Sequence, residues 1–235
     1  MQRLTVFITH SPSALANYYG PRALAALQEV ADVQRGDSEA DWSVQALAEA
    51  ARDCDIIVSD RRTPGSGELL TRLPKLLAFC RCAVDIRNVD IAAANSQGIL
   101  VTQVSAGFVA CVTEWIVGVM IDLSRGISAA AAVYHGGAVP TANMGRELRG
   151  STLGIIGHGQ IGRALADVAL ALRMNVVIAD PYADVANPAL RKVLLPELLA
   201  QSDYVVCLAV ATPQTENLMN AQAFATMKRS AYFIN

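Results

Sequence analysis

The sequence has no long uninterrupted apolar run, no cluster of basic side chains and little charge of either sign. Charged residues make up 17% of the 235 residues and leave a net charge of −2, which argues against nucleic acid as a partner. The apolar stretch at residues 109–123 is interrupted by Glu114 and Asp122, so it falls short of the roughly 18 uncharged residues of a membrane span. The first residues lack the basic and apolar regions of a signal peptide. We therefore expect neither a nucleic acid nor a membrane as a partner.

The five cysteines form neither a disulfide framework nor a metal motif. Their number is odd and their spacing irregular, which fits a reduced, cytoplasmic setting. Cys80 and Cys82 are separated by a single residue, whereas zinc motifs use Cys-x-x-Cys pairs. We expect no metal site and interpret the pair as small residues at the end of a strand.

Apolar residues make up 53% of the chain, which is enough for a sizeable core and argues against disorder. In the first half, the expected strands are residues 4–9, 31–34, 55–59, 76–80 and 99–103, and the expected helices are residues 22–30, 42–54 and 89–96. In the first of these helices we expect Ala23, Leu24, Leu27 and Val30 to face inward. The alternation of strands and helices predicts a parallel α/β sheet.

Residues 152–172 contain the pattern Gly-x-Gly-x-x-Gly between an apolar run and a helical repeat of apolar side chains. Gly157 allows a tight turn after the strand, Gly159 lets a pyrophosphate approach the backbone, and Gly162 lets the helix pack against the sheet. The free N–H groups and the positive end of the helix dipole would then face the phosphates. The pattern predicts a dinucleotide site, because the flanking strand and helix are both present.

Asp180 ends the next apolar run, 18 residues after Gly162, close to the roughly 20 expected for the acidic residue of such a site. A carboxylate at this point accepts hydrogen bonds from the adenosine ribose and repels a 2′-phosphate, which favours NAD over NADP. The alternative is that Asp180 merely opens the turn with Pro181.

The remainder of the second half continues the same alternation. We expect a long helix over residues 108–128, an exposed Ala- and Gly-rich connection over residues 129–150, and a second α/β unit from Ser151. Further elements are a helix at residues 196–201, a strand at 204–208, a helix at 221–227 and a strand at 231–234. Residues 209–213 follow a strand, so they are either a wall of the ligand crevice or an ordinary surface loop. A buried parallel strand normally leads to a covering helix, so we expect the sequence to be a fragment.

Several short motifs follow one another from about residue 69 to the end. They are Asn88-Val89-Asp90, Gly98-Ile99-Leu100, Thr113-Glu114-Trp115, the run 146–157, Asp180-Pro181-Tyr182, residues 212–216 and Phe233-Ile234-Asn235. In this order they resemble the D-isomer-specific 2-hydroxyacid dehydrogenases. Several motifs in a fixed order are a far more specific signal of a family than the three glycines alone.

The resemblance implies an α/β fold of two Rossmann- or flavodoxin-like domains with parallel sheets, linked by a long helix, with the active site in the cleft between them. Residues 1–104 would form the N-terminal substrate domain, which in this family is completed by the C-terminal tail. Residues 105–235 would form the NAD-binding domain, here cut short. The resemblance also implies a homodimer.

The implied reaction is hydride transfer between C2 of a 2-hydroxy acid and C4 of the nicotinamide of NAD. The family uses a histidine base held by a glutamate, and an arginine that grips the substrate carboxylate. The arginine follows the pattern Ile-Asn-x-x-Arg-Gly, and the printed sequence stops at Asn235, so all three are expected beyond it. None of His10, His135 and His158 is assigned as catalytic, although His10 ends a strand and is either a substrate contact or a turn residue.

The expected cofactor contacts come from the fingerprint, from Asp180 and from the loop after residue 208. They are Gly157, His158, Gly159, Gln160, Ile161, Gly162, Asp180, Ala209, Val210 and Thr215. At His158 the backbone is expected to matter more than the ring. Val210 and Leu208 stand where the family usually has proline and histidine, which would alter the packing of the cofactor.

The expected substrate contacts are Arg61, Ala83 and Val84. The family commonly has Gly-x-Gly where this sequence has Ala83-Val84-Asp85, and its backbone amides hold the substrate carboxylate. Asp85 places a negative charge near that anion, which is unfavourable unless Arg61, Arg62, Arg81 or Arg87 compensates. The substrate would therefore differ from simple lactate or glycerate types.

Three functions remain open from the sequence. The first is an NAD-dependent 2-hydroxyacid dehydrogenase that lacks its C-terminal part. The second is a non-catalytic NAD-binding protein on the same fold, which would gain weight if 235 residues were the natural length. The third is a related enzyme of the formate or phosphite dehydrogenase type.

Overall fold

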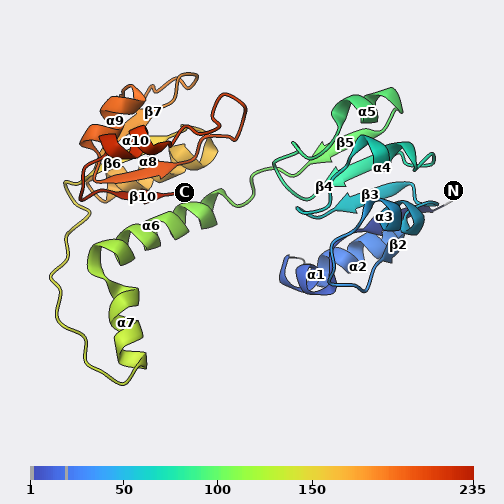
Figure 1. Cartoon of the computed structure of the whole chain (residues 1–235), viewed down its shortest axis with the longest axis horizontal. Helices are drawn as coiled ribbons and strands as arrows, with labels where there is room; N and C mark the ends of the chain where they lie inside the picture. The colour runs from blue at the N-terminus through green and yellow to red at the C-terminus, as the bar shows by residue number, and fades with distance from the viewer. Residues whose placement is uncertain (1–2, 19–20) are drawn as a thin grey trace. The chain divides into compact units, whose positions relative to one another are not determined.

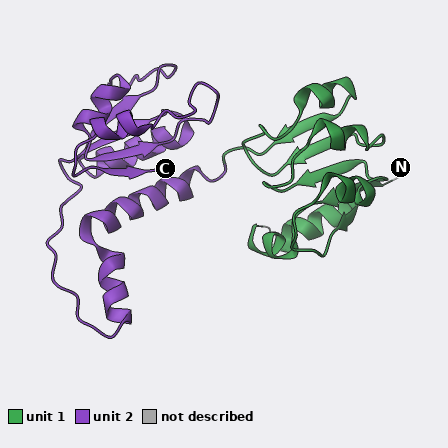
Figure 2. Cartoon of the chain, in the orientation of Figure 1, with its two compact units in different colours: residues 1–106 green, residues 107–235 purple. Residues whose placement is uncertain are grey.

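A computed structural model describes residues 3–18 and 21–235, and these divide into two compact units. Unit 1 comprises residues 1–106 and unit 2 comprises residues 107–235 (Figure 2). Each unit has one parallel sheet of five strands with helices packed against it, so the predicted α/β class with parallel sheets is confirmed.

The sheet of unit 1 has the strand order β2-β1-β3-β4-β5 (Figure 1). Its strands are β1 (Leu4–Ile8), β2 (Ala31–Arg35), β3 (Ile56–Ser59), β4 (Ala78–Arg81) and β5 (Leu100–Gln103). Its helices are α1 (Pro12–Tyr18), α2 (Pro21–Val30), α3 (Val44–Ala50), α4 (Gly67–Thr71) and α5 (Ile91–Ser96). This 2-1-3-4-5 order is that of flavodoxin-like sheets.

The core of unit 1 forms where continuous apolar strands meet short, well-capped helices. Ile57 and Phe79 on the central strands have no exposed surface. The side chains of Ser43, Ser66 and Asp90 accept backbone N–H groups at the starts of α3, α4 and α5, so each of these helices begins where the sequence places a capping residue.

Helix α2 differs from the expected pattern. Leu24 and Leu27 are half-buried against the sheet, but Ala23 and Val30 are exposed. The helix contacts its sheet through a narrow strip, and Val30 stands directly before β2, where the chain turns into the strand.

The sheet of unit 2 has the order β10-β9-β6-β7-β8. Its strands are β6 (Thr152–Ile156), β7 (Asn175–Ala179), β8 (Leu190–Lys192), β9 (Tyr204–Cys207) and β10 (Tyr232–Ile234). Its helices are α6 (Val109–Arg125), α7 (Ile127–His135), α8 (Gln160–Ala171), α9 (Leu195–Gln201) and α10 (Ala221–Thr226). After β6 the chain adds β7 and β8 on one side and then crosses to β9 on the other, so a topological switch point lies between β6 and β9.

The prediction of one long helix over residues 108–128 is wrong at its end, because the helix stops before Gly126. The prediction of a connection over residues 129–150 is wrong in its first part, because that part is helical. Gly126, with φ +65°, ends α6 in the left-handed conformation, and α7 starts at once at an angle of 69°. The carboxylate of Asp122 accepts the backbone N–H and the hydroxyl of Ser128, which fixes the new helix. The alanines that follow are strong helix formers. Figure 1 shows α7 and the segment after it extending away from the sheet.

Within residues 3–18 and 21–235, no single helix is long and apolar enough to cross a membrane. Helices α6 and α7 reach the length and composition of a span only when taken together as a bent pair.

Candidate functional site

The strongest candidate site lies at the carboxyl ends of β6, β7 and β9. Ile156 pairs with Ala179 on one side and with Cys207 on the other, so the three strands end at the same level. In open α/β sheets, ligands bind outside the carboxyl ends of the strands at the switch point. The glycine loop after β6 is therefore in the position where a ligand is expected.

Two of the three glycines are required by the packing of the loop. Gly157 has φ +95°, and a Cβ there would lie 2.8 Å from the backbone nitrogen of Ala209. At Gly162 a Cβ would lie 2.3 Å from the carbonyl oxygen of Gly157, so helix α8 could not pack against the turn. The glycine loop is thus fitted tightly between α8 and the loop after β9.

Gly159 is different, because a Cβ there would meet no atom of the described chain within 4 Å. The space beside it is open, and Gly159 caps α8 without a side-chain hydrogen bond. None of the hydrogen bonds of the described residues uses the N–H groups of Gly159, Gln160, Ile161 or Gly162. Open space beside four free amides at the positive end of a helix fits the diphosphate of a dinucleotide.

Asp180 ties this loop to the end of β7. Its Oδ2 accepts the backbone N–H of His158 at 2.7 Å, and its Oδ1 accepts those of Tyr182 and Ala183 at 2.9 and 3.0 Å. Burial alone would raise the pKa of Asp180, but these N–H groups hold that pKa below its usual value. Asp180 therefore opens the turn and also stands as a charged carboxylate beside the glycine loop.

The side chain of His158 is buried, although its backbone N–H reaches Asp180. Burial, together with the nearby charge of Arg163, lowers the pKa of His158, so the ring is neutral at pH 7. Its Nδ1 is buried, and no partner for it is found in the part of the chain that the structure describes. The ring is packed within the fold, and the backbone is what this residue contributes to the loop.

The loop after β9 lies against the glycine turn through Ala209, and Val210 is exposed. The hydroxyl of Thr215 donates to the carbonyl of Val210 at 2.6 Å and accepts the backbone N–H of Thr212 at 2.8 Å. Thr215 thus holds the shape of this loop from within, and the loop carries Ala209 and Val210 at the carboxyl end of β9.

At the carboxyl edge of unit 1, the buried side chain of Arg81 joins two loops. Its guanidinium donates to the carbonyl oxygens of Asp60, Arg61 and Asp85 at 2.5, 2.7 and 2.9 Å. Burial lowers the pKa of Arg81, while Asp60 and Asp85 oppose that effect. Sequence reasoning assigned Arg81 no role beyond charge compensation, because the carbonyl groups that it binds are far apart along the chain.

Asp85 is compensated by Arg87. Its carboxylate accepts the backbone N–H, the Nε and the Nη2 of Arg87, at distances of 2.7–3.0 Å. The hydrogen bonds from the Arg87 side chain and backbone lower the pKa of Asp85 to about 2, so it stays ionised at physiological pH. Beside this pair, Ala83 is buried and Val84 exposed, and their N–H groups take part in none of the hydrogen bonds of the described residues. Arg61 is exposed at the same edge.

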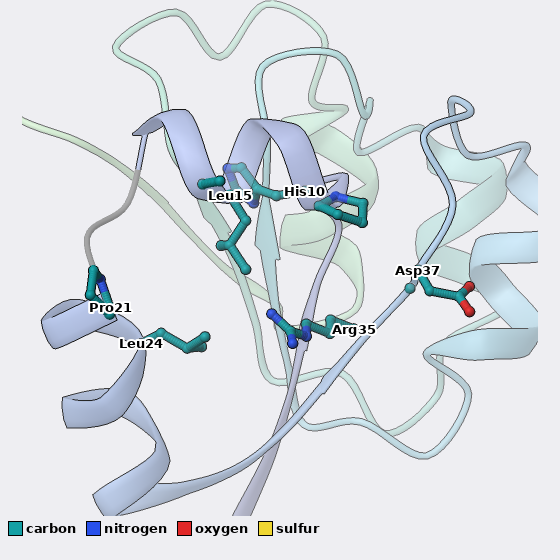
Figure 3. A pocket seen from close by; sticks show the side chains of 9 residues that line it. His10, Leu15, Pro21, Leu24, Arg35 and Asp37 are labelled. Atoms are coloured by element: carbon teal, nitrogen blue, oxygen red, sulfur yellow. The ribbon is translucent and has the colours of Figure 1, made fainter.

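The three histidines lie in three different settings. His10 is buried at the end of β1 and lines a cavity of about 480 Å³ with Leu15, Leu24 and Arg35 (Figure 3). Burial lowers the pKa of His10, although the charge of Asp60 opposes the effect. His135 is exposed at the end of α7.

None of the five cysteines forms a disulfide, and Cys80 and Cys82 flank Arg81 at the end of β4. In the described ranges, no three side chains of His, Cys, Asp or Glu stand together as metal ligands.

With this geometry in place, comparison with known proteins identifies the family. The sequence profile of the D-isomer specific 2-hydroxyacid dehydrogenase, NAD binding domain, matches residues 117–235. The chain belongs to this family. The resemblance seen in the sequence motifs is thereby confirmed, and the half of the chain that carries the glycine loop is an NAD-binding domain of the family.

Relatives in the family support this assignment along most of the chain. D-3-phosphoglycerate dehydrogenase of Methanocaldococcus jannaschii is 29% identical over 218 residues, which are 91% of this chain and 41% of that protein. Glycerate dehydrogenase of Methylorubrum extorquens is 32% identical over 217 residues, 84% of this chain and 63% of that protein. The TT0316 protein of Thermus thermophilus has a TM-score of 0.87 and 25% identity, covering 98% of this chain and 72% of its own. The chain thus spans about two fifths of the length of the D-3-phosphoglycerate dehydrogenase that it matches.

Proposed function

We propose that this chain belongs to an oxidoreductase that transfers a hydride between NAD(H) and a D-2-hydroxy acid or its 2-oxo acid. The observation that carries the proposal is the open space at Gly159, bordered by free amides and by the ionised Asp180. When bound, NAD supplies the nicotinamide carbon that accepts or donates the hydride.

In the proposed complex, the first turn of α8 binds the diphosphate through the amides of Gly159, Gln160, Ile161 and Gly162. The free lone pairs of the Asp180 carboxylate accept the hydroxyl groups of the adenosine ribose. Ala209 and Val210 line the side of the crevice for the nicotinamide half. Gly157, His158 and Thr215 hold the two loops in shape.

We expect Asp180→Ala to weaken NADH binding by about ten- to a hundredfold, since a hydrogen bond to a charged group is worth ~1.5–3 kcal/mol. The preference for NADH over NADPH should also shrink, because the repulsion of a 2′-phosphate disappears. Titration calorimetry with both coenzymes measures the two effects.

Two matched variants separate the causes of this loss. Asp180→Asn keeps an oxygen for the N–H groups of Tyr182 and Ala183, but it removes the charge and replaces the acceptor of the His158 N–H with an NH2 group. Asp167→Ala removes an exposed carboxylate from α8 and should bind NADH as the wild type does. Unchanged affinity and unchanged coenzyme preference in Asp180→Ala would contradict the proposed ribose contact.

For the substrate, we propose that the free N–H groups of Ala83 and Val84, with Arg61 nearby on the same edge, bind the carboxylate of the acid. Arg81 acts as a positioning residue, because it ties the loops of Arg61 and Asp85 together. We assign no acid–base residue among residues 1–235.

The activity is tested on the full-length product of the gene with NADH and a panel of 2-oxo acids. We expect loss of NADH absorbance with at least one acid of the panel and formation of the D-isomer of the hydroxy acid. Failure to reduce any 2-oxo acid, combined with oxidation of formate or phosphite, would move the assignment to another reaction on the same fold. NADH binding without any turnover would favour the non-catalytic alternative.

We also propose that the protein is a homodimer joined through the exposed apolar face of α6 and α7. Trp115, Ile127 and Tyr134 expose 58, 54 and 62% of their surface on these two helices. Large apolar side chains left exposed on two consecutive helices are candidates for an interaction surface. A cytoplasmic setting is proposed with it, since none of the five cysteines forms a disulfide.

Trp115→Glu should convert the dimer into a monomer, because a carboxylate cannot be buried unpaired in an apolar interface. Light scattering after size-exclusion chromatography measures the mass of both proteins. A wild type that is monomeric at micromolar concentration would refute the proposed dimer.

A further inference from the structure

A second cavity in unit 2, of about 390 Å³, lies at the end of α8 opposite the glycine loop. It is lined by the end of α6, by residues 146–149 and by residues 171–173 at and after the end of α8. The 12 residues of α8 separate it from the dinucleotide site by about 18 Å. The size is within the range of pockets that hold small molecules.

The lining of this cavity is strongly basic. It contains Arg125, Arg146, Arg149 and Arg173, against the single acidic side chain of Glu147. In the described part of the chain, no hydrogen bond or ion pair engages the side chains of Arg125, Arg149 or Arg173. Three of the arginines that line this cavity thus have no carboxylate bound to their side chains.

The fourth arginine is fixed in place and gives the cavity a rigid wall. The guanidinium carbon of Arg146 lies 4.8 and 4.7 Å from the ring centres of Tyr204 and Tyr232, and its Nη2 donates to the carbonyl of Ser230 at 3.0 Å. Its backbone N–H donates to the carbonyl of Ser124 at 3.1 Å. The segment that carries Glu147 and Arg149 is therefore anchored to the end of α6.

Three carbonyl oxygens at the end of α6 already accept hydrogen bonds. Those of Met120, Leu123 and Ser124 accept the hydroxyl of Ser124, the hydroxyl of Tyr232 and the N–H of Arg146, respectively. These hydrogen bonds weaken the repulsion that the three carbonyl oxygens exert on an anion in the cavity.

Arg173 stands in a backbone conformation that favours glycine. Its φ is +58°, in the left-handed region that few non-glycine residues adopt. Its N–H donates to the carbonyl of Leu170 and its carbonyl accepts the N–H of Gly150, so the turn is fixed on both sides. Arg173 is the first residue after the C-cap of α8, a position that glycine often occupies. Glycine would fit this turn without strain, so the guanidinium can be removed without disturbing the turn.

We propose that this cavity binds a small anion that carries two or more phosphoryl charges. Guanidinium groups match the oxygens of a phosphate in a two-pronged geometry, and several of them around one cavity favour a polyanion over a single carboxylate. The site is separate from the diphosphate-binding glycine loop and does not depend on the proposed reaction.

The test is titration calorimetry of the full chain with inorganic pyrophosphate and with fructose 1,6-bisphosphate, in saturating NADH so that the glycine loop is occupied. We expect the wild type to bind at least one of the two probes. Arg149→Ala and Arg173→Gly should each weaken that binding at least tenfold, and Glu147→Gln should strengthen it. Tighter binding of the sugar bisphosphate supports a phosphorylated metabolite as the ligand, and tighter binding of pyrophosphate supports a free inorganic anion.

Arg173→Gly also controls for folding, because it removes the guanidinium and relieves the left-handed backbone at once. Its melting temperature should equal or exceed that of the wild type. Arg52→Ala removes one exposed positive charge from unit 1 and should leave binding of both probes unchanged. The proposal is overturned if the wild type binds neither probe, if both cavity variants bind as the wild type does, or if Arg52→Ala weakens binding as much as they do.

Discussion

Gly159→Val is expected to weaken NADH binding about a hundredfold or more while leaving the melting temperature unchanged. A Cβ at this position meets no atom of the described protein within 4 Å, so the backbone there lies beside open space. The valine side chain would occupy the space through which the diphosphate approaches the amides of α8. A hundredfold loss corresponds to ~2.7 kcal/mol of binding free energy. Calorimetric titration with NADH, beside a thermal melt, measures both quantities.

The separation of the two effects makes this experiment decisive. Gly159→Ala adds only a methyl group and should give an intermediate affinity with the same melting temperature. If Gly159→Val binds NADH as tightly as the wild type, the diphosphate does not lie beside this glycine, and the proposed site is wrong. If binding and stability fall together, the space at Gly159 is not open as the structure indicates.

Gly162→Ala is expected to have the opposite pattern, with a loss of about 1–3 kcal/mol in the free energy of unfolding. Its Cβ would lie 2.3 Å from the carbonyl oxygen of Gly157, and neither backbone can shift without disturbing β6 or α8. Urea denaturation followed by circular dichroism measures the change. Gly159→Ala is the matched control, since it makes the same chemical change three residues earlier in the loop. Equal stability of the two variants would contradict the close packing of α8 on the turn.

The glycine loop could be predicted from sequence because its signals are local. A strand, three glycines at fixed spacing and an amphipathic helix lie within about 20 consecutive residues, and each glycine answers one steric demand. The central strands of both sheets were predictable for a similar reason, since strands buried on two faces are continuous apolar runs. The order of the strands follows from right-handed crossovers only once their partners are known.

The elements that escaped prediction lack such local signals. Strand β8 has only three residues, two of them charged and exposed, and it forms because β7 offers a free edge. Helix α7 was hidden by its composition, because an alanine-rich stretch beside glycines was interpreted as a connection. The break at Gly126 depends on the left-handed turn and on the bonds from Ser128 to Asp122. One glycine inside a helical pattern does not reveal such a turn.

The finer parts of the sites depend on contacts between distant segments. Arg81 binds carbonyl groups up to 21 residues away, and the four arginines of the basic cavity come from the ends of two helices and the segment before β6. The spacing of residues along the sequence does not predict these contacts between distant segments. For Asp85, the sequence identified the problem of an uncompensated carboxylate, and the structure identified Arg87 as the residue that compensates it.

The bonds of Asp180 have a consequence for any attempt to re-engineer coenzyme choice. One carboxylate both discriminates between the two coenzymes in our proposal and joins the end of β7 to the glycine loop through His158. Replacing Asp180 with a small neutral residue to admit NADPH would remove the preference for NADH. It would also remove the hydrogen bonds that hold the glycine loop to the end of β7. A successful conversion therefore needs a second substitution that supplies a new acceptor for these N–H groups, and single-site designs at this position should yield proteins that are tolerant of NADPH but poor binders of both coenzymes.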